Sequence, residues 1–231
     1  MLEPTASILL DQPLSDSPRE QPLLDAESAN QLTHGLGFLL SLVAAGVMIQ
    51  AVSQQADVWQ VVSCLIYVAS LVALYAASTL SHSFTDPARR AFYRTLDQVC
   101  IFLLLAGSYT PFGITHLRSG PWGLILVVMW LLVAIGIWLR VTRGDGAVPF
   151  VFFAMIGWLP GLALGHIYSL SGLHGLGLVL SGGLAYTVGL WFLTNDHRHR
   201  YLHAVWHLFT IAGSACHFLF LQWYVAEWPL A

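Results

Sequence analysis

The sequence predicts an all-α integral membrane protein, a bundle of seven transmembrane helices. Three observations support this fold class. The chain of 231 residues is 57% hydrophobic and only 9% charged, whereas a soluble domain carries roughly 25% charged residues. Its apolar residues fall into seven long segments, and its arginines gather in alternate connections between them. We therefore expect a multi-pass protein of the cell (plasma) membrane.

Each apolar segment is close to the ~20 residues with which a helix crosses a bilayer. The segments span residues 30–52, 58–81, 95–116, 122–141, 148–169, 174–194 and 201–223. Because the connections are short, residues 28–231 are expected to form one transmembrane domain. Residues 1–27 are rich in Pro, Ser, Asp, Glu and Gln, a composition typical of a disordered tail. Ser28 and Gln31 have the spacing of a capping box at the first helix.

The arginines predict the orientation of the chain. With the N-terminus in the cytoplasm, the inner parts hold eight of the nine arginines, and the outer loops hold only Arg118. This asymmetry follows the positive-inside rule and also places the C-terminus outside. The sequence shows no basic patch of the kind that binds nucleic acid, so we expect no nucleic-acid partner.

A pair of histidines opens the last segment. His203 and His207 lie four residues apart, so they share one face of a helix. Helix direction brings His82, at the inner end of the second segment, to the same depth. Three imidazoles around one point suit Zn²⁺ and leave a fourth position for water. The sequence therefore predicts a zinc site at His82, His203 and His207, against the simpler interpretation of histidines that only hydrogen-bond within the bundle.

Asp97 and Ser78 are the candidate catalytic residues beside this site. Asp97 begins the third segment on the inner side, and Ser78 lies one turn before His82. A catalytic zinc lowers the pKa of its water towards ~7. Asp97 can hold that water, act as a general base or orient a ligand histidine. Ser78 can hydrogen-bond the water or a developing oxyanion.

Further polar residues are less specific. Glu27, Asn30 and His34 share one helix face and can approach the site from a fourth side, although a polar helix start at the headgroups explains them equally well. His217 lies about 15 Å beyond His207 along the helix. We expect it to hydrogen-bond between helices and not to bind the same metal.

Two other residue types complete the polar inventory. Asp196 is interpreted as a loop or cap residue. The cysteines lie within apolar runs and are expected to be buried, without disulfides, at Cys64, Cys100 and Cys216.

The order of these motifs carries a family resemblance. They are Glu27-x2-Asn30-x2-Thr33-His34-x2-Gly37, Ser78-x3-His82, Asp97 and His203-x3-His207. Together they resemble the signature of hemolysin III proteins, the bacterial branch of the progestin and adiponectin receptor (PAQR) family, over residues 27–223. The resemblance implies a seven-helix bundle with an inner N-terminus, three zinc histidines at the positions above, an aspartate acting through water and a nearby serine. It also implies kinship with alkaline ceramidases, which hydrolyse lipid amides, and with receptors.

These observations favour a zinc-dependent, ceramidase-like hydrolase of lipid amides or esters that uses zinc-activated water, with a membrane lipid as substrate or ligand. One alternative is a non-catalytic sensor or regulator of membrane state in which zinc is structural. The other is a pore-forming or lytic protein, as the hemolysin name implies. A pore needs a polar lane across the bilayer, and the outer half of the segments offers few polar residues aligned with the inner site.

Overall fold

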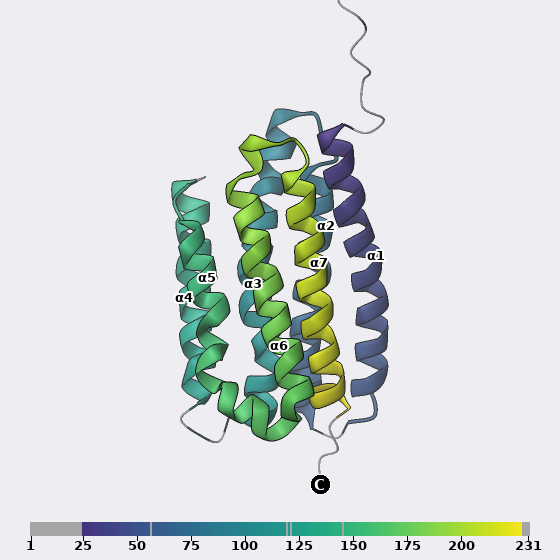
Figure 1. Ribbon diagram of the computed structural model, residues 1–231, viewed down its shortest axis with the longest axis vertical. Coiled ribbons are helices and arrows are strands. Elements are labelled where there is room, and N and C mark those ends of the chain that lie inside the picture. The colour runs from purple at the N-terminus through teal and green to yellow at the C-terminus, as the bar shows by residue number, and fades with distance from the viewer. Residues whose placement is uncertain (1–24, 56, 119, 121, 145, 228–231) are drawn as a thin grey trace, which may run out of the picture.

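The structure, a computed structural model, describes residues 25–55, 57–118, 120, 122–144 and 146–227. All regular elements within these residues are helices, which confirms the predicted all-α fold (Figure 1). Six helical stretches are long and apolar enough to cross a membrane, so this is a multi-pass membrane protein. The helices are α1 (Ala26–Val52), α2 (Val58–Ser81), α3 (Pro87–His116), α4 (Gly123–Arg143), α5 (Phe150–Trp158), η1 (Leu159–Ala163), α6 (Leu164–Thr194), η2 (Asp196–Arg198), α7 (Leu202–Leu221) and η3 (Gln222–Ala226).

The first helix begins earlier than the sequence pattern predicts. Asp25 is the N-cap, and its carboxylate accepts a hydrogen bond of 2.7 Å from the backbone N–H of Ser28. The predicted capping box is therefore wrong: Gln31 instead donates to the Ser83 hydroxyl at 2.9 Å. Glu27 consequently lies in the first turn of α1 and not in the tail, of which residues 1–24 are outside the described residues.

Helix α3 also extends beyond its predicted start at residue 95. It begins at Pro87, and the Asp86 side chain accepts a hydrogen bond of 2.9 Å from the backbone N–H of Arg89. A capping aspartate followed by proline at the first helical position is a strong helix start. The two added turns are rich in arginine, so apolar content alone did not reveal them.

The two segments predicted at 148–169 and 174–194 form one helical stretch of 45 residues, from Phe150 to Thr194. Pro160 lies in the short helix η1, and Gly172 has a positive φ of 62° within α6. In Figure 1, α5 runs to the lower end of the bundle and α6 leads back to the upper end. The chain changes direction without an intervening loop, so the structure has six candidate spans where the sequence predicts seven segments.

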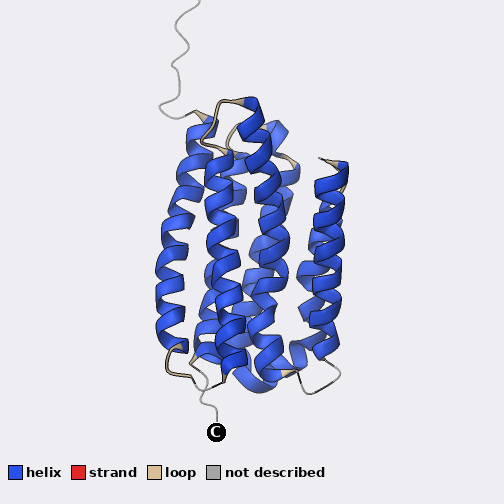
Figure 2. Ribbon diagram, turned by 180° about the vertical axis from the view of Figure 1, so that it is seen from behind, coloured by secondary structure: helices blue, strands red, loops and turns tan. Residues whose placement is uncertain are grey.

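The packing brings four helix ends together at the upper end of the bundle in Figure 1. There α1, α3 and α7 begin and α2 ends, and Figure 2 shows the same bundle from behind. Helix α2 packs between α1 and α3, and α7 packs against α6 and α1. Outward-facing apolar residues, such as Leu39 and Val43 on α1 and Leu131 on α4, are more than half exposed, as expected for contact with lipid.

Candidate metal centre

Three histidines meet at the upper end of the bundle. His82 caps the end of α2, and His203 and His207 lie on the first two turns of α7. One ring nitrogen of each lies within 4.8 Å of the others. The ring centroids are 5.2 Å apart for His82 and His203, 5.3 Å for His82 and His207, and 4.6 Å for His203 and His207. This cluster can hold a metal ion.

Two of the rings are oriented by carboxylates. The Nδ1 of His82 lies 2.7 Å from Oε2 of Glu27, and the Nδ1 of His203 lies 2.9 Å from Oδ2 of Asp196. A carboxylate accepts a hydrogen bond only from a protonated Nδ1, which leaves Nε2 with its lone pair. Metal-binding histidines are typically held in this way by an oxygen on the second nitrogen.

The third ring is oriented by a hydroxyl. Thr33 donates its proton to the carbonyl oxygens of Ala29 and Asn30, both at 2.9 Å. Its oxygen can therefore accept from the Nδ1 of His207, which is 2.9 Å away. All three histidines thus have Nδ1 engaged by oxygen and Nε2 left as the ligand atom.

Glu27 has a second contact, to an arginine on a neighbouring helix. Its other oxygen, Oε1, pairs with the guanidinium of Arg90 on α3, so one carboxylate joins α1, α2 and α3. Burial, His203 and Arg94 lower the pKa of His82 to about 4. The His82 ring is therefore neutral at neutral pH, as a metal ligand must be.

Asp97 and Ser78 form a second polar contact below the histidines. Ser78 is 1% exposed, and its side chain lies beside the Asp97 carboxylate. Asp97 Oδ1 is buried and has no hydrogen-bond partner among the described residues. Because Ser78 lies one turn before His82, this carboxylate lies roughly 5 Å along α2 from the metal ligand. An unpaired carboxylate oxygen in such a place is available to water or substrate.

The face of α1 that carries Glu27, Asn30 and His34 points at the cluster. His34 is 3% exposed, and its ring centroid lies 3.6 Å from that of His207 and 5.3 Å from that of Tyr75. Both His34 nitrogens and the side-chain oxygen of Asn30 are buried without hydrogen-bond partners among the described residues. This face of α1 therefore lies against one side of the site and does not merely face the headgroups.

Sequence analysis missed two of the orienting residues. Asp196 was interpreted as a loop or cap residue, but it binds His203. Thr33 received no separate role, although it lies next to His34 in the quoted motif. The signal that could have found Asp196 is its position seven residues before His203 at the same end of the bundle.

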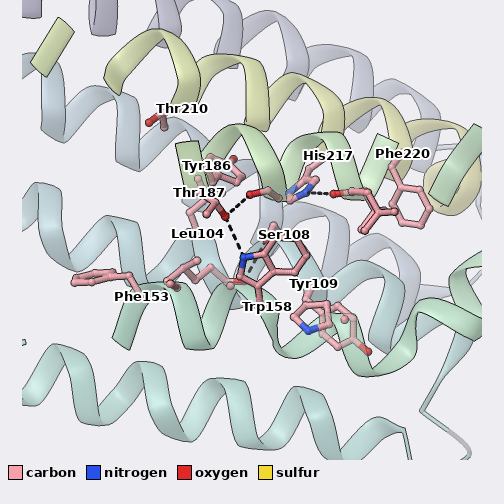
Figure 3. Close-up of a pocket in the computed structure, with 18 of the residues that line it drawn as sticks. Leu104, Ser108, Tyr109, Phe153, Trp158, Tyr186, Thr187, Thr210, His217 and Phe220 are labelled. Carbon is pink, nitrogen blue, oxygen red and sulfur yellow. Dashed lines mark hydrogen bonds between the residues drawn. The ribbon is translucent and has the colours of Figure 1, made fainter. Parts of the chain in front are cut away.

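An apolar cavity of about 160 Å³ begins within one turn of the site (Figure 3). Leu74, Ile101 and Thr210 line its upper end. Each of them lies about one helical turn closer to the lower end of the bundle than Ser78, Asp97 and His207, respectively. The cavity continues between α3, α5, α6 and α7 as far as Phe220 and Leu221. His217 lines its middle and hydrogen-bonds the Val179 carbonyl on α6, which confirms the predicted interhelical role.

The donor set fits a divalent ion. Three imidazoles with Nε2 free match the protein ligands of a metal site that keeps one position open. Two carboxylates at the Nδ1 atoms add negative charge that favours a cation. The fold and this site together define a multi-pass α-helical membrane protein with a three-histidine cluster at one end of its bundle that could hold a metal ion.

Comparison with known proteins gives this class a family. A family model described as Haemolysin-III related matches residues 24–218. The chain therefore belongs to the Haemolysin-III related family, as its motifs predicted.

Similar proteins come from bacteria and from mammals. Hemolysin-3 of Bacillus cereus is 37% identical over 203 residues, which cover 86% of this chain and 91% of the relative. The Hemolysin-3 homolog of Bacillus subtilis is 36% identical over 88% of this chain and 96% of its own length. The human monocyte to macrophage differentiation factor is 27% identical over 91% of this chain and 89% of its own length.

Proposed function

We propose that this protein is a zinc-dependent membrane hydrolase that cleaves an amide or ester bond of a lipid. The observation that carries this proposal is a three-histidine cluster at the same end of the bundle as the buried, unpaired Oδ1 of Asp97, with an apolar cavity close by. Such a site would bring a metal, a base and apolar side chains for part of an acyl chain within about two helical turns.

The proposed topology is seven crossings with the N-terminus and the metal centre on the cytoplasmic side. The stretch Phe150–Thr194 has 45 residues. As a helix it would be roughly 68 Å long, about twice the thickness of the hydrocarbon core. The reversal at its lower end therefore supports two crossings. Seven of the eight described arginines lie at the upper end with the start of α1, which supports an inner location for that end.

In the proposed mechanism, His82, His203 and His207 would hold a zinc ion through Nε2. A zinc ion in such a site activates a bound water and polarises a carbonyl oxygen. Asp97 accepts a proton from the water that attacks the carbonyl carbon. The C–N or C–O bond of the substrate then breaks, and the proton passes to the leaving amine or alcohol. Ser78, whose side chain lies beside Asp97, would position that carboxylate.

The cavity supports a lipid substrate. Its lining is mostly aliphatic and aromatic, from Leu74 near the site to Phe220 at the far end. An acyl chain placed there would have its carbonyl group at the depth of Asp97. Burial of the chain would supply binding energy that does not depend on the headgroup.

A panel of lipid amides and esters tests the proposal. Purified wild-type protein is expected to release fatty acid from at least one substrate. Asp97→Asn should reduce the rate by about 10²–10⁴-fold, the usual contribution of a general base, with unchanged zinc content. Equal background release by both proteins, with equal metal content, would remove the enzymatic function and leave a sensor with a structural metal.

Membrane lysis is the second candidate function, because two relatives carry the name Hemolysin-3. The largely apolar lining of the cavity argues against a water-filled pore. Dye-filled vesicles containing the purified protein decide the matter: leakage above that of empty vesicles would support lysis, and retention of the dye would exclude it.

A further inference from the structure

Four of the polar side chains that line the largely apolar cavity come from four different helices. This polar belt consists of Ser108 on α3, Trp158 on α5, Thr187 on α6 and His217 on α7, and Figure 3 shows all four facing the same space. His217 lies ten residues beyond His207 on α7, a separation of roughly 15 Å. The belt is therefore well removed from the metal centre.

His217 is held in one orientation. Its Nε2 lies 3.3 Å from the carbonyl oxygen of Val179. A carbonyl only accepts, so Nε2 carries the proton and Nδ1 is an acceptor. A Cβ at Gly182 would lie 2.4 Å from the His217 ring, so only glycine at that position leaves room for the ring. Within the described residues, Nδ1 has no hydrogen-bond partner.

The other belt residues have already committed their protons. The Ser108 hydroxyl donates to the Leu105 carbonyl at 3.2 Å. The Thr187 hydroxyl donates to the Gly183 carbonyl at 2.7 Å, and the Trp158 indole N–H donates to the Thr187 oxygen at 3.0 Å (Figure 3). The belt therefore offers acceptors, the Nδ1 of His217 and the oxygen of Ser108, but none of its four side chains offers a free donor.

We infer that the cavity binds an acyl chain with a hydroxyl group near its middle, which donates a hydrogen bond to Nδ1 of His217. The inference rests on the proposed function only in taking an acyl chain as the occupant of the cavity. A plain chain would leave the buried acceptor unpaired among methylene groups, whereas a hydroxylated chain pairs it. A keto group would not pair the Nδ1 of His217, because both are acceptors. The substrate class is thus a lipid amide or ester of a hydroxy fatty acid.

Two matched ligands test this inference. N-octadecanoylethanolamine and the same amide with a hydroxyl on carbon twelve are titrated against purified wild-type protein, with binding followed by native mass spectrometry. The hydroxylated amide should bind about fivefold more tightly, the usual worth of one hydrogen bond. In His217→Phe, which keeps a ring but removes the acceptor, both amides should bind equally. Leu104→Met, a volume-conserving change in the same cavity, should retain the preference.

The outcomes separate this inference from the proposed hydrolysis. Equal binding of the two amides by wild-type protein would overturn the inference, whether or not either amide is cleaved. A preference that persists without cleavage would support it and overturn the hydrolase. Should His217→Phe fail to fold, Ser108→Ala and the wild-type comparison decide, with zinc content as the measure of an intact bundle.

Discussion

Two histidines on α7 show how one residue type acquires two different roles. His207 has Nδ1 engaged by Thr33 and turns Nε2 towards His82 and His203. His217 has the opposite arrangement, because Nε2 is bound to the Val179 carbonyl and Nδ1 remains available. In each case one hydrogen bond selects the free nitrogen. The nitrogen that is engaged by the first partner thus determines which nitrogen remains to accept a metal ion or a hydrogen bond.

The surroundings of the two histidines differ in charge as well. The two histidines that cluster with His207 each contact a carboxylate, on Glu27 and on Asp196. The lining of the cavity around His217 includes no carboxylate among the described residues. Negative charge favours a cation at the first position, whereas the second position favours a neutral donor.

The largest expected effect comes from removing His207. His207→Ala should lower metal affinity by more than about 100-fold, since even residues that only orient a ligand contribute 10–100-fold. The melting temperature should fall with it, because metal binding stabilises the folded state. Elemental analysis and thermal unfolding in detergent measure both. His217→Ala should keep its metal. Wild-type metal content in His207→Ala would contradict the assignment of His207, and not His217, as a metal ligand.

The next effect concerns the carboxylate that orients His82. Glu27→Gln keeps an oxygen near Nδ1 but loses the charge that pairs with Arg90. Metal affinity should fall about 10–100-fold, as measured by competition with a chelator. Glu227→Gln, at the opposite end of the bundle, is the matched control. Unchanged affinity in Glu27→Gln would mean that Glu27 serves only to hold Arg90.

A moderate effect is expected where α6 meets His217. Gly182→Ala would bring a Cβ to 2.4 Å from the His217 ring, whereas Gly177 on the same helix has nothing within 4 Å. Gly182→Ala should therefore destabilise the bundle by about 1–3 kcal/mol. Gly177→Ala should stabilise it by up to about 1 kcal/mol through helix propensity. Reversible unfolding in a denaturing detergent measures both, and similar values would show that the His217 ring is free to move.

The sequence predicted much of this architecture because its signals are local. Apolar length defined α2 to the residue, and the spacing of His203 and His207 placed both on one face. The predicted direction of each helix then placed His82 at the same end of the bundle as this pair. These arguments need only helix geometry and direction, and both can be read from the chain.

The orienting contacts could not be predicted because they depend on how helices pack. Glu27 reaches His82 only because α1 begins at Ala26 and lies against α2. Asp196 reaches His203 through the turn of η2, whose shape no short pattern specifies. The break within α6, by contrast, was predicted, because Gly172 with its positive φ of 62° lies between the segments predicted at 148–169 and 174–194.

The smallest expected effect tests whether the two regions are independent. Tyr75 contacts His34 beside the metal centre and donates to Ser214 at 2.9 Å, and Ser214 in turn bonds Tyr186. Tyr75→Phe removes one buried hydrogen bond and should cost about 1 kcal/mol.

Tyr109→Phe is its matched control, because the Tyr109 hydroxyl is buried without a partner among the described residues. Removing that hydroxyl should be neutral or slightly stabilising. Metal affinity should be unchanged in both variants, since His34 packs against the Tyr75 ring and not against its hydroxyl. A change in metal affinity in Tyr75→Phe alone would show that the hydrogen bonds through Ser214 couple the metal centre to the cavity around His217.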